Sequence, residues 1–437
     1  MGQRFYVETL GCPKNQVDSD KIIGTLLADG MTATDDASAA DLVVVNTCAF
    51  IDEARRESID TILALEEHRK DGARLVVTGC MAERYGAELA EALPEVDQVS
   101  GFGVPVHQPS TVGAGKRLIP VSSAPIPSFD LLNLPRPKST SPWAYVKIAE
   151  GCDRSCGFCA IPSFRGPQRS RDVESILREV DELEAHEIVL VAQDLASYGK
   201  DRPDELGAGS IVPLVRAVSA RARWTRLLYL YPSDLTDDLI DAICETGVPY
   251  FDLSLQHVSK PLLRRMRRWG DGDRFLRRIT DIRDREPPAA FRSNFIVGYP
   301  GETEADHDQL LSFVEQAELD WCGFFSYSPE EGTHAYTLDG AVPRGLMNDR
   351  LAELRELQDD ITARRRDDLI GLTTTVLVDE PGTARSHREA PEIDGIIEVP
   401  THLVPGTFVE VRIVDAMGPD LIAEPVAAFA VETVGGG

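Results

Sequence analysis

Short runs of hydrophobic residues alternate with amphipathic stretches through the first third of the chain. Phe5–Thr9, Asp41–Asn46 and Arg74–Thr78 are apolar segments rich in β-branched residues, as expected for the buried strands of a parallel sheet. Between them, Asp18–Asp29 and Asp52–Lys70 repeat apolar residues at the spacing of one helix face. Strands that alternate with helices in this way predict an open α/β domain.

A proline-rich stretch interrupts the alternation between residues 105 and 142, where we expect a linker. Six strand–helix units follow, and they predict a partial parallel βα barrel that a charged helix over Leu346–Leu369 closes. The expected strands are Ala144–Ile148, Glu187–Ala192, Arg226–Leu230, Tyr250–Leu255, Phe291–Val297 and Gly323–Tyr327. The expected helices are Val173–His186, Ile211–Ala222, Thr236–Thr246, Pro261–Arg268, Asp273–Arg285 and Glu304–Gln316.

From about Gly371 the pattern changes to short strands divided by Pro and Gly, which fits a small β-barrel or sandwich. These strands are expected at Thr373–Val378, Gly395–Glu398, Phe408–Val414 and Leu421–Ala423. The predicted fold class is therefore α/β with three domains. An open α/β domain occupies residues 1–120, a linker residues 121–142, a partial (βα)6 barrel residues 143–370 and a small β-barrel residues 371–437.

Composition narrows the class of protein. The chain has 437 residues, 43% hydrophobic and 27% charged, which is typical of soluble globular proteins. No apolar run approaches the roughly 18 residues that span a bilayer, and the first residues form a strand-like segment rather than a signal peptide. We therefore expect a cytoplasmic protein with no membrane partner, in which eight cysteines favour metal binding or catalysis over disulfides. The formal net charge of −27 favours a basic protein partner over RNA.

Cys152, Cys156 and Cys159 follow the expected strand Ala144–Ile148 at C-x-x-x-C-x-x-C spacing. Three thiolates hold three irons of a cubane and leave the fourth iron open, whereas ferredoxin-type clusters take four cysteines. A zinc site would need a fourth ligand nearby, and none of the eight histidines is so placed. The loop therefore predicts a 4Fe-4S cluster whose open iron binds S-adenosylmethionine (SAM), as in radical SAM enzymes.

Cys12, Cys48 and Cys80 each lie just past the carboxyl end of an expected strand, 36 and 32 residues apart. In an open α/β sheet those ends face one crevice, where ligands bind. Three thiolates distant in sequence therefore converge, and they predict a second cluster with an open iron. The alternative is three buried cysteines, a common environment for this residue.

Two further features have ordinary structural interpretations. Cys244 and Cys322 have no partners at ligand spacing, and we expect both to be core residues. The charge run of Arg264, Arg265, Arg267 and Arg268 is expected on a solvated helix face.

The motifs at these positions resemble those of the methylthiotransferases, a family of radical SAM enzymes, over essentially the whole chain. TLGCPKNQVDSD (9–20), VVVNTCAFIDEARRESID (43–60) and VTGCMAE (77–83) are similar to their amino-terminal domain. KIAEGCDRSCGFCAIPSFRGPQRSR (147–171) resembles their radical SAM loop, and the tail resembles a TRAM domain. Position 20 is Asp where the family commonly has Glu, and Asp153 and Ala160 vary within the loop, but no thiolate is missing.

Within this family the details resemble the RimO type, which modifies an aspartate of small-subunit ribosomal protein S-twelve. Gly-Cys-Pro-Lys-Asn at 11–15, LYLYP (228–232) and SPEEGT (328–333) are RimO-like forms. From Leu372 to Gly437 there are eleven Asp or Glu, three Arg and no Lys. An acidic tail suits a lysine-rich ribosomal protein and argues against RNA binding. A MiaB-type enzyme acting on a tRNA adenosine and a non-enzymatic iron–sulfur carrier remain the alternatives.

The resemblance implies two 4Fe-4S clusters, SAM as both methyl donor and radical source, and a flavodoxin- or ferredoxin-like electron donor. It implies that a methylthio group is added to the β-carbon of the aspartate, a C–H bond that acid–base chemistry does not activate. Phe158 matches the aromatic residue usual in the loop. Further candidates for SAM contacts are Gln193, Ser254 and Gln256 at strand ends, and Gly298 and Gly301 in a turn at the barrel mouth. Structural polar residues at strand ends are the alternative.

Overall fold

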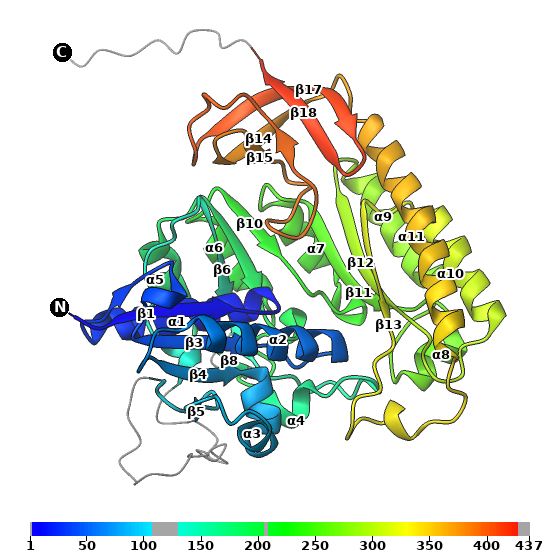
Figure 1. Ribbon diagram of the computed structural model, residues 1–437. Coiled ribbons are helices and arrows are strands. Elements are labelled where there is room, and N and C mark those ends of the chain that lie inside the picture. The colour runs from blue at the N-terminus through cyan, green and yellow to red at the C-terminus, as the bar shows by residue number, and fades with distance from the viewer. Residues whose placement is uncertain (1, 107–129, 205–208, 427–437) are drawn as a thin grey trace, which may run out of the picture.

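The computed structural model describes residues 2–106, 130–204 and 209–426. Its amino-terminal part is a parallel sheet of order β2-β1-β3-β4-β5. The strands are β1 (Arg4–Thr9), β2 (Thr32–Ala33), β3 (Leu42–Thr47), β4 (Arg74–Gly79) and β5 (Gln98–Val99). The helices are α1 (Pro13–Ala28), α2 (Asp52–His68) and α3 (Cys80–Ala92). The predicted open α/β arrangement is confirmed, and it lies at the lower left of Figure 1.

Alternate residues of β3 divide the core of this sheet in two. Leu42 and Val44 pack with Ile22 of α1 on one face, whereas Val43 and Val45 pack with Ile62 of α2 on the other. Successive strand residues point to opposite faces. The β-branched run is therefore continuous because both faces of the sheet are covered by helices.

The central part is the predicted partial barrel of six parallel strands. A parallel bridge from Leu230 to Leu253 joins the strand set β6-β9-β10 to the set β11-β12-β13. The strands are β6 (Trp143–Lys147), β9 (Glu187–Val191), β10 (Trp224–Leu227), β11 (Tyr250–Gln256), β12 (Ala290–Val297) and β13 (Trp321–Ser326). The small elements near its mouth are β7 (Ala149–Glu150), α4 (Ile161–Arg165) and β8 (Arg169–Ser170).

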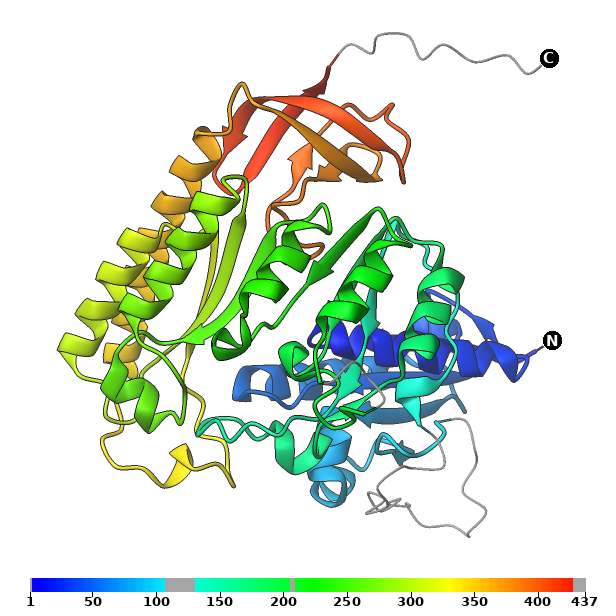
Figure 2. The ribbon, with the colours of Figure 1, turned by 180° about the vertical axis from the view of Figure 1, so that it is seen from behind.

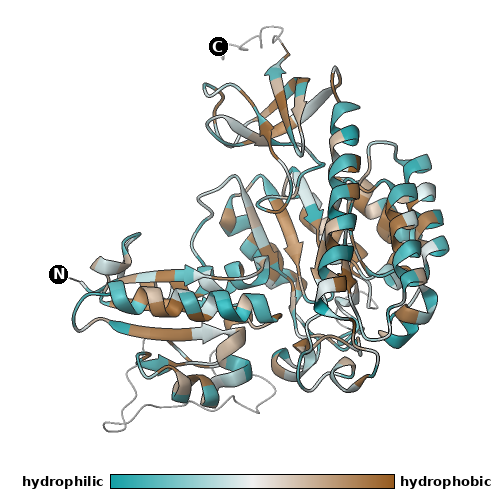
Figure 3. Cartoon of the chain, turned by 45° about the vertical axis from the view of Figure 1, so that its right-hand side comes forward, coloured by the Kyte–Doolittle hydropathy of each residue, from teal (hydrophilic) through white to brown (hydrophobic). Residues whose placement is uncertain are grey.

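Helices cover the outer side of the barrel, as the view from behind shows (Figure 2). They are α5 (Val173–Leu183), α6 (Val212–Ser219), α7 (Asp237–Cys244), α8 (Lys260–Arg265), α9 (Gly272–Arg285), α10 (Glu304–Ala317) and α11 (Arg344–Asp367). The barrel strands are hydrophobic, whereas the helices carry polar residues on their outer faces (Figure 3). The largest core therefore lies between strands and helices.

The carboxy-terminal part is a closed barrel of order β14-β15-β16-β18-β17. Its strands are β14 (Thr373–Glu380), β15 (Thr383–Arg385), β16 (Ile397–Glu398), β17 (Phe408–Met417) and β18 (Asp420–Pro425). This closure decides between the barrel and the sandwich that the sequence left open. Of the expected linker, residues 121–129 lie outside the described residues, and the rest holds only a short 3-10 turn at Leu131–Asn133.

This small barrel sits on the amino ends of the central strands (Figure 1). Glu187, the first residue of β9, pairs with Arg226 of β10 at 2.8 Å and with Arg385 of β15 at 2.7 Å. The Trp224 ring, at the start of β10, meets the Phe408 ring edge-on at 4.9 Å. The carboxyl ends of the central strands therefore face away from the small barrel.

Candidate active site

The three amino-terminal cysteines lie at the carboxyl ends of neighbouring parallel strands. Cys12 caps the start of α1 just beyond β1, Cys48 directly follows β3, and Cys80 is the first residue of α3 after β4. The register pairs Thr9 with Asn46 and Thr47 with Gly79, so the strands end together. Helix α1 begins at Pro13 rather than at the expected Asp18, because Cys12 is extended and proline suits the first helical position.

Two glycines allow this convergence. Gly11 has a φ of +100°, and a Cβ there would lie 2.9 Å from the Cβ of Cys48. Gly79 has a φ of +92°, and a Cβ there would lie 2.3 Å from Oδ1 of Asn46. Only glycine adopts such conformations without strain. Each turn therefore brings its cysteine close to the next strand end.

The environment of these thiols combines burial with nearby positive charge. Cys48 and Cys80 are buried, and burial together with the other two cysteines raises the pKa of Cys48 to about 12. Burial alone would raise the pKa of Cys12, but Lys14 and Arg165 hold it below the usual thiol value. Burial raises the pKa of Cys80, although Arg165 donates a hydrogen bond to its Sγ at 3.0 Å.

The second cysteine set lies in the loop after β6 and β7. The backbone N–H of Cys159 donates to the carbonyl of Cys156 at 3.2 Å, and the N–H of Arg154 donates to Sγ of Cys152 at 3.4 Å. Arg268 donates from Nη1 to Sγ of Cys156 at 3.3 Å. Burial raises the pKa of Cys152 to about 11 and that of Cys159 to about 12.

Both sets fit a cubane with an open iron. Each supplies three thiols, all eight cysteines are free, and Arg165 and Arg268 each offer a hydrogen bond to a ligand sulfur, a recognised means of tuning such clusters. Among the described residues, no three His, Cys, Asp or Glu side chains are close enough to hold a single metal ion. A cubane takes each thiolate on a separate iron, so three thiols are enough to hold it.

A buried charge network joins the two cysteine sets. Arg165, at the end of α4, contacts Cys80 and donates to both carboxylate oxygens of Glu150 at 3.0 Å. Lys147 pairs with Glu150 at 2.7 Å and also with Asp18 of α1. Burial alone would raise the pKa of Glu150, but Arg165 and Lys147 lower it to about 2. Because Cys152 donates its N–H to Gly166 next to Arg165, one short helix touches both sites.

A second junction between the amino-terminal domain and the central barrel is centred on Glu330. Glu330, in the loop after β13, is 3% exposed and pairs at 2.6 Å with Arg55 of α2 and with Arg84 of α3. Ser328 accepts a hydrogen bond from the N–H of Asp52 at 3.3 Å. The SPEEGT segment of the central barrel therefore binds the amino-terminal domain directly.

The strand-end candidates for SAM contacts lie near the cysteine loop, and their role stays a prediction. Gln193 donates from Nε2 to Glu150 at 2.7 Å, while its buried Oε1 has no partner among the described residues. The carbonyl of Ser254 accepts from Arg268, the arginine that contacts Cys156. Gln256 ends β11 with a φ of +70°, and Phe158 packs against the central core.

Gly298 and Gly301 lie in the expected turn at the barrel mouth. A Cβ at Gly298 would lie 2.0 Å from the sulfur of Met347, and one at Gly301 would lie 3.0 Å from Nε of Arg265. Tyr299 between them approaches the cysteine loop, since a Cβ at Gly157 would lie 2.8 Å from its hydroxyl. Packing against the chain itself accounts for both glycines, and their contact with SAM stays a prediction.

The sequence missed several residues around the site. Tyr231 lies under two guanidinium groups, Arg154 at 3.9 Å and Arg268 at 4.0 Å from its ring centroid. Tyr229 has a φ of +65°, a strained conformation of the kind that gathers at functional sites. The motif LYLYP was visible, but its contacts with arginines remote in sequence were not.

The expected solvated arginine face is partly wrong. Arg264 and Arg267 are exposed, but Arg268 binds Cys156, and Arg265 donates from Nε to the carbonyl of Pro300 at 2.9 Å. Helix α8 ends at Arg265, so Arg268 lies outside the helix and can contact the cysteine loop. Cys244 and Cys322 pack against the central core, as expected.

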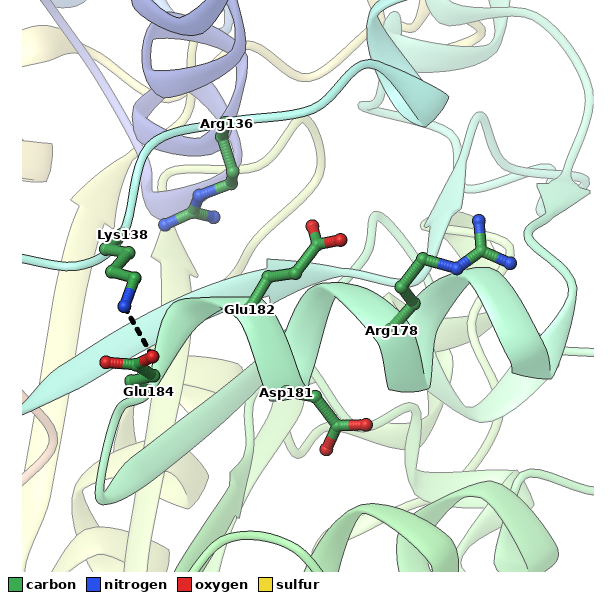
Figure 4. A pocket seen from close by; sticks show the side chains of 6 residues that line it. All are labelled: Arg136, Lys138, Arg178, Asp181, Glu182 and Glu184. Atoms are coloured by element: carbon green, nitrogen blue, oxygen red, sulfur yellow. Dashed lines mark hydrogen bonds and ion pairs between the residues drawn. The ribbon is translucent and has the colours of Figure 1, made fainter.

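A hollow of about 520 Å³ lies elsewhere on the surface (Figure 4). Charged side chains line it, among them Lys138 and Glu184, which pair with each other and are both about two-thirds exposed. None of the cysteines lines this hollow, so it is a charged surface feature separate from the site above.

Comparison with known proteins decides the family. Residues 4–101 match the uncharacterized protein family UPF0004, residues 146–314 the radical SAM superfamily and residues 370–426 the TRAM domain. The ribosomal protein uS12 methylthiotransferase RimO of Kineococcus radiotolerans is 41% identical, over 95% of this chain and 96% of its own length. The chain belongs to the RimO family. The RimO protein of Sorangium cellulosum is 40% identical, over 97% of this chain and 91% of its own length.

Membership of the RimO family makes the chain a radical SAM methylthiotransferase, with SAM and a 4Fe-4S cluster in its central domain. A solved radical SAM methyltransferase, TsrM of Kitasatospora setae, is 15% identical with a TM-score of 0.46, over 77% of this chain and 74% of its own. In the part of the chain that the structure describes, no helix is long and apolar enough to cross a membrane.

Proposed function

We propose that this enzyme adds a methylthio group to the β-carbon of an aspartate in ribosomal protein uS12, the S-twelve protein of the small subunit. The RimO relatives, at about 40% identity over nearly the whole chain, are named as uS12 methylthiotransferases, and the aspartate β-carbon is what the resemblance of the motifs implies. The proposal includes a second 4Fe-4S cluster on Cys12, Cys48 and Cys80, beside the one on Cys152, Cys156 and Cys159. It also includes cytoplasmic location and a flavodoxin- or ferredoxin-type electron donor.

The observation that carries the proposal is that two adjacent residues link the two three-thiol sites. Arg165 donates to Sγ of Cys80, and the next residue, Gly166, accepts from the N–H of Cys152. A single radical SAM site makes radicals and needs only one cysteine loop. A second thiol site held beside it supports sulfur insertion, which needs a place for sulfur next to the place where SAM is cleaved.

When bound, the clusters and SAM supply one-electron chemistry and a site for sulfur, which side chains alone do not provide. The chain contributes position, charge and exclusion of water. The buried strand ends fix Cys48 and Cys80, and Arg165 and Arg268 place positive charge on ligand sulfurs in both sites. The junction at Glu330 holds the two domains together, so the distance between the sites is fixed by packing.

The test compares one cysteine from each set. Reconstituted wild-type protein should hold about eight irons, as two cubanes of four. Cys48→Ala should lose about half of the iron and all methylthiolation of uS12, yet still release 5′-deoxyadenosine from SAM. Cys156→Ala should lose the release of deoxyadenosine as well, because its cluster cleaves SAM.

Two outcomes would contradict the proposal. Sulfur transfer by Cys48→Ala would remove the second cluster from the mechanism. In a deletion strain, mass spectrometry should show loss of the methylthio increment on the uS12 aspartate. Loss of a methylthio group from tRNA nucleosides, with uS12 unchanged, would assign the enzyme to the MiaB-type reaction instead.

A further inference from the structure

Lys14 is a buried cation beside the amino-terminal cysteine set, and the contact closest to its ammonium is an aromatic ring of the central domain, with the buried carboxylate of Asp252 interacting at longer range. It is the second residue of α1, two positions after Cys12, and it is 8% exposed. Its Nζ lies 3.3 Å from the centroid of the Tyr229 ring. Among the described residues, no carboxylate lies within ion-pair distance of this ammonium, and no acceptor takes a hydrogen bond from it.

This environment is unusual for a buried lysine in the same chain. Lys21 and Lys147, both fully buried, pair with carboxylates, Lys21 with Glu179 at 3.2 Å and Lys147 with Glu150 at 2.7 Å. Burying a charge is unfavourable unless it is paired. A cation–π contact offsets only part of this cost, and the three N–H donors of Lys14 have no hydrogen-bond acceptor among the described residues.

The position of Lys14 points to where a substrate would lie. Of its three-thiol set Cys12 is the least buried and Gly11 before it is exposed, so the set opens on the side of Lys14. Tyr229, under the ammonium, is two residues from Tyr231, on whose ring Arg268 stacks while it contacts Cys156. Lys14 and its ring partner Tyr229 therefore lie close to residues that contact both cysteine sets.

We propose that Lys14 binds the side-chain carboxylate of the substrate aspartate and so selects an acidic residue for the reaction. This rests on the proposed function, because the carboxylate belongs to the residue that is modified. The strained backbone of Tyr229, with its N–H donating to Asp252 at 2.9 Å, holds the ring that positions the ammonium. Lys14 is thus a specificity-determining residue, and Tyr229 positions it.

The chemistry sets the expected size of the effect. A hydrogen bond to a charged partner contributes about 1.5–3 kcal/mol, which corresponds to about 10- to 150-fold in affinity. An asparagine in place of the substrate aspartate has the same shape and no charge. The wild-type enzyme should therefore prefer the aspartate form by about 10- to 150-fold, and Lys14 should account for that preference.

The experiment measures binding of two labelled uS12 peptides, with aspartate or asparagine at the modified position, to reconstituted holoenzyme by fluorescence anisotropy. Lys14→Met should bring the ratio of the two Kd values close to one, and Lys14→Arg should keep part of it. Lys138→Met is the matched control, because Lys138 is exposed and paired at the surface, and it should leave the ratio unchanged. Iron content checks that each variant is loaded.

Each result distinguishes the inference from the function on which it rests. If wild-type enzyme methylthiolates uS12 but Lys14→Met keeps the preference for aspartate, the carboxylate contact is refuted while the function stands. Equal binding of both peptides by wild type, a measurement that needs no variant, also refutes it. If wild type fails to modify uS12, the proposed function falls, and the assignment of Lys14 falls with it.

Discussion

Replacing Arg165 with methionine should loosen the junction between the two cysteine sites. Its side chain is 3% exposed and contacts Glu150, Asp18, Asn15 and Cys80. Removing one partner of a buried ion pair costs about 3–5 kcal/mol, because the remaining charge stays buried. Lys147 still pairs with both carboxylates, so the lower figure applies, about 3 kcal/mol.

A loss of about 3 kcal/mol corresponds to roughly 150-fold in the equilibrium for opening the junction. Hydrogen exchange under native conditions measures that equilibrium locally, so amides of α1 and α4 should exchange about two orders of magnitude faster. Loss of the positive donor at Cys80 should also shift the reduction potential of the cluster proposed there to more negative values.

Arg169→Met is the matched control. Arg169 makes a two-pronged contact with Asp130 at 2.7 and 2.8 Å, but its side chain is 29% exposed. Partly exposed pairs contribute about 1 kcal/mol or less, so exchange near Arg169 should rise less than tenfold. If the Arg165 and Arg169 variants exchange at the same rate, the network does not hold the sites together and the reasoning is wrong.

Two more predictions concern the junctions between domains. Glu330→Gln leaves Arg55 and Arg84 without their buried carboxylate. The variant should therefore slow methylthiolation more than the release of deoxyadenosine. Mass spectrometry of the product and chromatography of deoxyadenosine from the same reaction measure the two. The exposed Glu331→Gln is its control, and equal effects of the two would contradict the role of this junction. Glu389 is fully buried, and although burial opposes ionisation, Arg366 and Ser386 lower its pKa to about 2. A folded-state pKa below the unfolded value of about 4.3 stabilises by about 3 kcal/mol above pH 4.3, a contribution that is lost as the pH falls toward 2. Glu389→Gln should therefore speed hydrogen exchange of the β14 and β17 amides at pH 7. It should also remove the loss of stability that protonation of Glu389 causes at low pH. Unchanged hydrogen exchange in this variant would contradict the prediction.

Local pattern was enough to predict the longer strands and the position of the amino-terminal cysteines at strand ends, but not the short strands β2, β5, β7, β8 and β15. The continuous apolar runs at Leu42–Thr47 and Arg74–Gly79 are enough to predict buried strands. Because neighbouring parallel strands end at the same edge of a sheet, the cysteines that follow them are predicted to lie close together. Helix α3 was missed because Tyr85 breaks it with a φ of −125°, which interrupts the apolar period.

The partners of the cysteines were not predictable in the same way. Arg165 lies on a helix of five residues, too short to show periodicity, and it contacts Cys80, which is 85 residues away in sequence. Lys14 was visible in its motif, but the ring beneath it comes from the other domain. Long-range contacts of this kind depend on how the domains pack, and a single sequence holds no local signal for them.

The small barrel packs on the amino ends of the central strands. A substrate that reaches both the cysteines and the small barrel must therefore be at least as long as these strands. The cysteines lie beyond the opposite ends, and β11 alone, with seven residues, measures about 23 Å. A short peptide that fills the reaction site ends before the acidic barrel, so the charge of the barrel's exposed face should not affect its turnover. A large folded substrate, such as the whole uS12 proposed above, would span that length and could contact both ends.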